Sequence, residues 1–400
     1  MSKILLMDYG WCNFHNIIEL VKSGHDVKVT TTSYNDFDDI PHAFWDQYGV
    51  EIVDHGNRDS FIKKWLLNSD RDMVINTHPM LGHWSKVMEP YSDRFEYLGM
   101  TKLAGSLEKN KWLVRSSMQN RVPPILVPKV VRPIAPCVAK PKVLEPPNDV
   151  VSICHHQWQA DRANSDPNSQ GKLYFEEYIP KPSIETNVDF VVSNGKWSIR
   201  HTQEIIGEDV CKEFGKFQHW TCIAQFKRLP DWVEDIVLAE SRVILDWIAT
   251  QVCPDASFIG QITGLFTPNG DWYFCEINSR PEQTCSLPIF VTGDEFIEAF
   301  RGKPEILGDA FPNDVDKLMV VPEWDNAPYP MDLHEKYGVA IPCGLDLNKD
   351  GTYTISDHMK KPRQRGNNLI GMVVCDAVIP EGFVTEFEQS AYKIISKMLK

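Results

Sequence analysis

The sequence lacks the motifs of several common protein classes. It has no Cys-x-x-Cys pair, and the loop after its first predicted strand lacks the Gly-x-Gly-x-x-Gly fingerprint, which argues against a dinucleotide site. No apolar run reaches the ~18 residues of a membrane-spanning helix. The apolar start at residues 4–7 is too short for a signal peptide. We therefore expect a protein with no membrane partner.

The cysteines that are present indicate a reducing compartment. Several of the 10 cysteines, such as Cys137, Cys275 and Cys375, lie inside apolar runs. Free, buried thiols in this arrangement are typical of cytoplasmic proteins, so we predict a cytoplasmic location.

Basic residues are also fewer than acidic residues. The chain has 41 Lys and Arg against 55 Asp and Glu, for a net charge of −14. A dedicated nucleic-acid-binding protein would normally carry a basic surface, so direct nucleic-acid binding is not expected. A length of 400 residues is too great for one compact core and predicts several domains.

The first hundred residues alternate between strand and helix patterns. Strands are predicted at residues 4–7, 26–30 and 73–76, and helices at 13–22 and 61–67. This alternation predicts a doubly wound α/β domain over residues 1–100. Such sheets place ligands at the carboxyl ends of their strands, here the loop at residues 8–13.

The rest of the chain divides into two further predicted domains. Residues 101–315 form the central one, with a small subdomain at about 122–178, and residues 316–400 form a β-rich C-terminal domain. The proline-rich segment 122–147 is interpreted as short strands with turns, and residues 161–171 as a loop. Further predictions are helices at 103–118, 231–248 and 383–399, a hairpin at 184–201 and a strand at 258–266.

Residues 272–280, Trp-Tyr-Phe-Cys-Glu-Ile-Asn-Ser-Arg, are the most informative stretch. Glu276, Asn278 and Arg280 follow an apolar strand at every second position, so they are predicted to share one face. A carboxylate and an amide oxygen are ligands that Mg²⁺ accepts, usually together with nucleotide phosphates. An arginine suits an anionic substrate. An edge strand with one polar face would give the same pattern.

A Glu-x-Asn pair at the end of a strand is the metal-binding signature of the ATP-grasp ligases, and the chain resembles that superfamily. Within it, the resemblance is greatest to the phosphoribosylamine–glycine ligase family. Residues 99–112, which include Leu107, Glu108 and Lys111, look like that family's Leu-Glu-x-Ser-Lys helix. The resemblance implies a multidomain α/β ATP-grasp fold with the N-terminal doubly wound domain and C-terminal β-rich domain predicted above.

The resemblance also implies a role for each matching residue. Glu276 and Asn278 would bind Mg²⁺, with Mn²⁺ as an alternative ion, and Arg280 would be the catalytic anchor for carboxylate or phosphoryl groups. His15 and Glu282 would contact substrate, although the residues around His15 favour an ordinary helix position for it. ATP would be bound by Lys111 and Lys140 at its phosphates, by Glu185 at its ribose, and by the hinge Glu176, Glu177, Tyr178 and Ile179 at its adenine.

Two segments depart from the family pattern. The family has a glycine-rich phosphate loop directly after the strand lysine, but residues 141–149 contain no glycine and three prolines. Glycines allow backbone N–H groups to turn toward phosphate, whereas prolines remove N–H donors. A second glycine-rich run is replaced by residues 207–216, which puts phosphoribosylamine itself in doubt as the amine.

Three functions follow from these patterns. The first is an ATP- and Mg²⁺-dependent carboxylate–amine ligase that joins a small amino acid, such as glycine, to phosphoribosylamine or another amine through an acyl phosphate. The second is a degenerate relative that binds nucleotide or a protein partner without catalysis. The third is an unrelated α/β transferase in which the Glu-x-Asn match is accidental.

Overall fold

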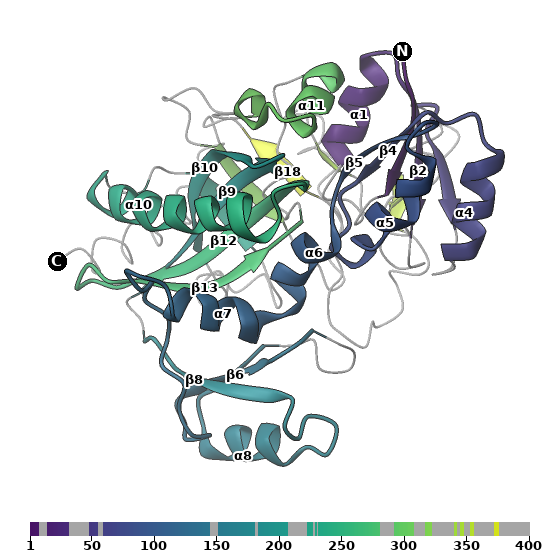
Figure 1. The fold of residues 1–400 in the computed structure, drawn as a ribbon. Coiled ribbons are helices and arrows are strands. Elements are labelled where there is room, and N and C mark those ends of the chain that lie inside the picture. The colour runs from purple at the N-terminus through teal and green to yellow at the C-terminus, as the bar shows by residue number, and fades with distance from the viewer. Residues whose placement is uncertain are drawn as a thin grey trace.

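A computed structural model gives the architecture of the chain (Figure 1). It describes residues 1–7, 14–31, 48–54, 59–144, 151–180, 183–206, 222–226, 229, 231–280, 292–307, 317–321, 340–341, 345–347, 353–355 and 372–375.

The N-terminal sheet contains five parallel strands in the order β3-β2-β1-β4-β5. Its central strand is apolar on both faces, with Ile4, Leu5 and Leu6 completely buried, as expected of a parallel sheet covered by helices. This confirms the predicted α/β unit and adds two strands, β3 and β5. The strands are β1 Lys3–Met7, β2 Asp26–Thr31, β3 Glu51–Asp54, β4 Met73–Asn76 and β5 Glu96–Gly99, and the helices are α1 Phe14–Lys22, α4 Asp59–Asn68, η2 Pro79–Leu81, α5 Trp84–Met88 and η3 Glu89–Tyr91.

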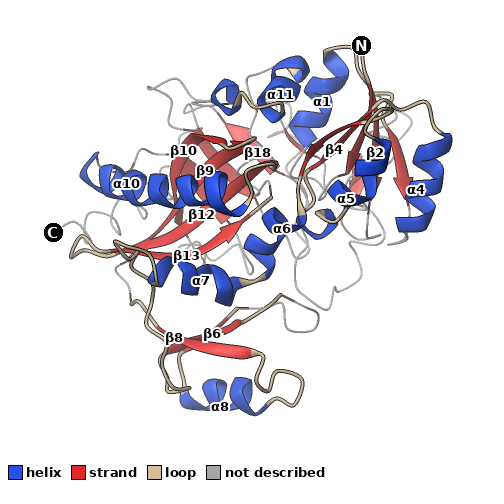
Figure 2. Cartoon of the chain, viewed as in Figure 1, coloured by secondary structure: helices blue, strands red, loops and turns tan. Residues whose placement is uncertain are grey.

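A large sheet forms the centre of the molecule (Figures 1 and 2), in the order β13-β12-β9-β10-β11-β14-β18-β15. Helix α10 lies across one of its faces over the largest apolar cluster, which includes Phe190, Phe258 and Ile262. The predicted hairpin is confirmed, since Asn194 and Gly195 have φ values of 49° and 78°, as a tight two-residue turn requires. The elements are β9 Ile184–Ser193, β10 Lys196–Ile206, β11 Cys222–Phe226, α10 Asp231–Trp247, the π-helical turn η4 Ile248–Val252, β12 Ser257–Phe266, β13 Trp272–Asn278, α11 Gly293–Phe300 and η6 Pro304–Leu307.

The described C-terminal strands continue this large sheet. Strand β14 pairs with β11, and β18 pairs with both β14 and β15. The predicted helix at residues 383–399 lies outside the described residues. The strands are β14 Lys317–Val321, β15 Ala340–Ile341, β16 Leu345–Leu347, β17 Tyr353–Ile355 and β18 Met372–Cys375, of which β16 and β17 form a separate pair.

A small antiparallel sheet projects from the central part of the chain (Figure 2). Its strands are β6 Cys137–Pro141, β7 Ser152–Cys154 and β8 Leu173–Glu177, and helix α8, Gln157–Ser165, packs against it. One prediction was wrong here, and the short strands predicted in the proline-rich segment are confirmed only for β6. Residues 161–165 are helical because Ala160 is buried against the sheet. The proline-rich segment forms no strand before β6, and Val130 makes only an isolated bridge to Glu176.

The predicted single helix at 103–118 is two helices, α6 Lys102–Lys109 and α7 Lys111–Gln119. Asn110 separates them because its side chain accepts a hydrogen bond from the Leu113 N–H at 3.0 Å and so caps the second helix. None of the helices in the described part of the chain is both long and apolar enough to span a bilayer.

Candidate functional site

A β-bulge in β13 determines which residues face the predicted site. Phe274 pairs with Gly264 and Glu276 pairs with Thr263, so Cys275 is an extra residue between them. Simple alternation would put Phe274 and Glu276 on the same face. Instead Phe274 and Ile277 both lie in the core beneath α10, and Glu276 and Asn278 face the opposite side.

Lys111 on α7 is paired with Glu276. Their side chains form an ion pair in which Lys111 is 7% and Glu276 24% exposed. Burial raises the pKa of Glu276, but the charges of Lys111 and Lys140 outweigh it and lower that pKa to about 2. The Asn278 amide also donates to Glu276, at 3.4 Å. Glu276 is therefore an anion that faces cationic groups.

Polar residues continue from β13 across the two neighbouring strands. Thr263, opposite Glu276, donates to Asn187 Oδ1 at 2.7 Å. Gln261, opposite Asn278, donates to Asp189 at 2.8 Å. All four of these residues are buried. We call Gln261, Thr263, Asn187 and Asp189, with Glu185 at the next alternate position of β9, the polar face of the central sheet.

Lys140 on β6 reaches the same region from the small sheet. Its ammonium lies 2.8 Å from Glu176 Oε2, and it donates to the Cys275 carbonyl at 3.4 Å. Burial opposes its charge, but Cys275 and Glu176 more than compensate and raise the pKa of Lys140. Arg115 on α7 donates to the other oxygen of Glu176 at 2.7 Å. The lysine is thus a fixed cation between the two sheets.

The predicted adenine hinge begins within β8, which ends with Glu176 and Glu177. The Glu177 N–H donates to the Lys129 carbonyl at 2.8 Å, and Tyr178 and Ile179 follow outside any strand. The Tyr178 ring packs edge-on against His155. Glu185 lies on β9, where burial, with a smaller contribution from Glu276, raises its pKa to about 7.

The remaining predicted residues are placed less fully. Arg280 donates through Nε to Glu108 Oε1 on α6 at 2.8 Å. His15 lies in α1, but its side chain is outside the described part, and Glu282 lies outside the described residues altogether. Lys142, the single lysine of the glycine-free segment 141–149, donates to the Gly171 carbonyl at 3.0 Å.

The oxygen donors of Glu276 and Asn278 fit a magnesium ion whose other ligands are phosphate oxygens. No group of three or more His, Cys, Asp or Glu residues in the described part of the chain could hold a metal alone. Glu276 and Asn278 would supply two oxygens, and Mg²⁺ commonly takes one or two carboxylates plus substrate phosphates.

Arg115, Glu108, Asn187, Thr263 and Gln261 were not predicted as site residues. Arg115 lies four residues after Lys111 on the same helix face, which is a usable signal. Glu185, Asn187 and Asp189 alternate along one strand in the same way as Glu276 and Asn278. The roles of Thr263 and Gln261 depend on strand pairing, which has no local sequence signal.

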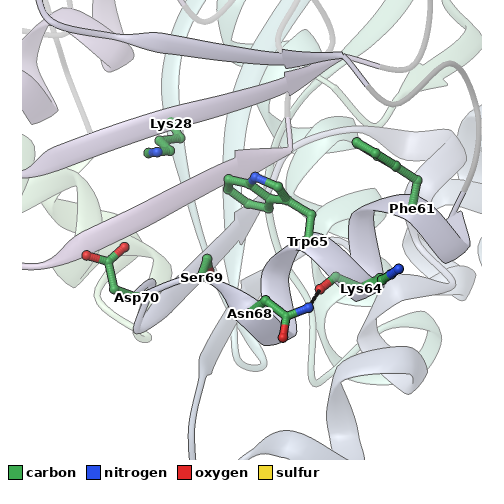
Figure 3. Close-up of a pocket in the computed structure, with 7 residues that line it drawn as sticks. All are labelled: Lys28, Phe61, Lys64, Trp65, Asn68, Ser69 and Asp70. Atoms are coloured by element: carbon green, nitrogen blue, oxygen red, sulfur yellow. Dashed lines mark hydrogen bonds between the residues drawn. The ribbon is translucent and has the colours of Figure 1, made fainter.

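A separate cavity of about 590 Å³ lies beside α4 and contains none of these residues (Figure 3). Its lysine on β2, Lys28, is paired with Glu51 and lies 5.7 Å from the centre of the Trp65 ring. Because this charge is already satisfied, we assign the cavity no role. It is lined by Lys28, Phe61, Lys64, Trp65, Asn68, Ser69 and Asp70.

Comparison with solved protein structures identifies the fold of the chain. No protein-family model and no curated protein sequence matches the chain. Among solved structures, it is similar over its whole length to N5-carboxyaminoimidazole synthase from Aspergillus clavatus in complex with ADP and 5-aminoimidazole ribonucleotide. The TM-score is 0.61 at 13% identity, covering 99% of each chain. The chain has the ATP-grasp fold.

Two more structures with the ATP-grasp fold are similar to the chain. N5-carboxyaminoimidazole ribonucleotide synthetase from Thermotoga maritima gives a TM-score of 0.60 at 15% identity over 98% of each chain. Biotin carboxylase from Campylobacter jejuni gives 0.59 at 14% identity, covering 94% of this chain and 87% of the other. The multidomain α/β fold expected from the sequence is confirmed, whereas the specific likeness to phosphoribosylamine–glycine ligase remains a prediction.

Proposed function

We propose that the protein is an ATP- and Mg²⁺-dependent carboxylate–amine ligase. One observation carries the proposal: Glu276, Lys111 and Lys140 come from three different elements and meet beside the polar face of the central sheet. Structural relatives named as complexes with ATP or ADP support a nucleotide site in this fold.

The residues have complementary tasks in such a reaction. ATP would transfer its γ-phosphoryl group to the carboxylate, which releases ADP and forms an acyl phosphate. The amine then attacks the carbonyl and phosphate leaves. Lys111 and Lys140 hold the phosphates by charge, and Arg280 stabilises the negative charge on the acid or phosphoryl group. When bound, Mg²⁺ would neutralise phosphate charge at Glu276 and Asn278.

The substrates belong to two classes. We propose a ribonucleotide amine as acceptor, either phosphoribosylamine, as the sequence resemblance suggests, or an aminoimidazole ribonucleotide such as the one named with the Aspergillus protein. Glycine is the first acid to test. Bicarbonate is the second, because the names of the similar structures describe carboxylation.

The test is ADP release by the purified protein with Mg·ATP and a panel of acids and amines. Release that requires both an acid and an amine supports the ligase. The competing function, nucleotide binding without catalysis, is motivated by the missing glycines and by Lys142, which is bonded to Gly171 rather than freely available. Tight Mg·ATP binding with no ADP from any pair would favour that function.

A Glu276→Gln variant tests the metal assignment. Glutamine keeps the size of the side chain and one acceptor for Lys111, so the fold should survive, whereas Glu276→Ala would leave a buried lysine unpaired. We expect Mg²⁺-dependent ADP release to fall by about 100-fold or more, in line with the loss of a metal ligand. Glu89→Gln, an exposed carboxylate, serves as control. Full activity in Glu276→Gln would contradict the assignment.

A further inference from the structure

A buried arginine borders the polar face, and its terminal nitrogens have no hydrogen-bond partner within the described part of the chain. Arg200 is completely buried, and its Nε donates to the Leu307 carbonyl at 3.3 Å. Among the residues that the structure describes, neither Nη1 nor Nη2 of Arg200 has a hydrogen-bond partner. Burying an unpaired guanidinium destabilises a fold by roughly several kcal/mol. A fold does not retain such an arginine without compensation.

Strand pairing locates Arg200 relative to the site. It is the extra residue of a bulge in β10, beside the pair His201–Asp189. Leu307, which it reaches, packs with Val191 and Ile259, and Val191 shares its face of β9 with Asp189 and Asn187 by alternation. The arginine therefore extends onto the polar face, at the boundary where η6 begins to cover the sheet.

A second unsatisfied donor lies on the same face. The Asn187 Nδ2 atom is buried and has no partner among the described residues, although its Oδ1 accepts from Thr263. Asn187 pairs with Gln203, two residues along the strand from the Asp189–His201 pair beside Arg200. Asp189, the carboxylate between them, accepts from Gln261 at 2.8 Å. Two buried side chains on adjacent strands thus have N–H donors without partners among the described residues.

We propose that Arg200 and Asn187 bind the phosphate of a phosphate-bearing amine substrate. The two terminal nitrogens of Arg200 and the Asn187 amide together supply several N–H donors. The two oxygens of a carboxylate lie in one plane and cannot accept from all of them, whereas the three oxygens of a phosphate can. The position is separate from Lys111 and Lys140, which face the nucleotide side. This inference deepens the proposed ligase function. The identity of the substrate rests on that function, whereas the existence of the anion site does not.

The test uses inorganic phosphate as the probe, with the full chain saturated with a non-hydrolysable Mg·ATP analogue to occupy the nucleotide site. Phosphate should raise the melting temperature of the wild type in a saturable manner, as binding to the folded state requires. Arg200→Met should weaken phosphate binding at least tenfold. Without phosphate, Arg200→Met should melt no lower than the wild type, because the loss of one long hydrogen bond to Leu307 is offset by removal of a buried charge with unpaired terminal nitrogens.

Two further variants make the test specific. Asn187→Asp keeps the acceptor for Thr263 but places a negative charge beside the anion, so it should abolish the phosphate effect. This variant provides an independent test if Arg200→Met does not fold. Arg71→Met removes another buried arginine, in the N-terminal domain, and should leave the phosphate effect intact.

Three results would overturn the inference: unchanged phosphate affinity in Arg200→Met or Asn187→Asp, equal protection of the wild type by acetate, or a loss of analogue binding in parallel with phosphate binding. Failure of the ligase proposal has a different signature: no acid–amine pair would give ADP release, while the phosphate effect and its loss in the variants would persist.

Discussion

At the scale of single residues, two glutamates of the site differ in pKa because their surroundings differ. Glu276 faces Lys111 and Lys140, so its pKa is lowered to about 2. Glu185 lies two strands away on the same face, and burial raises its pKa to about 7. At neutral pH the first carboxyl is charged, whereas the second is close to its titration midpoint. Cations brought by a ligand would favour the charged form of Glu185.

Replacing Glu185 by Gln tests this difference through stability. Between about pH 4.5 and 7 the folded protein retains a proton on Glu185 that the unfolded chain has lost, so the free energy of unfolding falls as pH rises. We expect wild type and Glu185→Gln to differ least below pH 4.5, and the variant to become more stable by on the order of 1 kcal/mol above pH 7. Chemical denaturation at a series of pH values measures this, and a constant difference would contradict it.

At the scale of elements, helix α6 positions the site through close backbone packing. Gly105 faces η2 so closely that a Cβ atom at this position would overlap the Pro79 carbonyl oxygen. Glu108, one turn later, is buried and bonded to Arg280. The short distance between α6 and η2 therefore connects the N-terminal domain to a predicted catalytic residue.

Gly105→Ala should destabilise the protein even though alanine favours helices. Intrinsic propensity alone would stabilise α6 by about 1 kcal/mol, but relief of the overlap must move backbone and should cost about 1–3 kcal/mol. Thermal or urea unfolding gives the sign. Ser106→Ala, at the next and partly exposed position, serves as control and should change stability by less than about 0.5 kcal/mol. A more stable Gly105→Ala would show that the two elements can separate without cost.

The elements that sequence predicted best are those with strong apolar periodicity. The strands at β1, β2 and β4, the helix α10 and the β9–β10 hairpin agree with the sequence-based boundaries to within a few residues. The misses have local causes. Asn110 can cap a helix as well as occupy one, and the bulge at Cys275 is created by the partner strand. Glu276 and Asn278 could be predicted as neighbours, but Thr263 and Arg200 could not, because their positions depend on cross-strand register.

At the scale of the whole molecule, a buried ion cluster attaches the small sheet to the central domain. Glu176 on β8 bonds both Arg115 on α7 and Lys140 on β6, and all three are buried. The Trp112 and Tyr174 rings meet edge-on across the same junction, with centroids 5.1 Å apart. The backbone adds a bond from the Leu144 N–H to the Lys109 carbonyl at 2.8 Å. Charge, ring contact and backbone thus join the two parts at one place.

Glu176→Gln should loosen this junction without unfolding the rest. It leaves two buried cations facing a neutral amide, which should cost about 3 kcal/mol. Hydrogen exchange should become faster in β6 and β8, while β1 and β4 of the N-terminal sheet should keep their protection. Glu177→Gln is the matched control, because an amide can still accept from the Lys129 N–H. Equal exchange in both variants would mean that the cluster does not hold the junction.

The extra residue in β13 has a consequence for how this hairpin can change in length. Upstream of Cys275 the strand is anchored by Trp272 and Phe274 beneath α10, so a residue gained or lost in the turn at 267–271 leaves the inward and outward sides unchanged. Downstream, a shift by a single position would exchange Ile277 with Asn278, placing an amide among hydrocarbon and an isoleucine where charge is required. Insertions and deletions should therefore be tolerated at the tip of the hairpin and excluded from its last three residues.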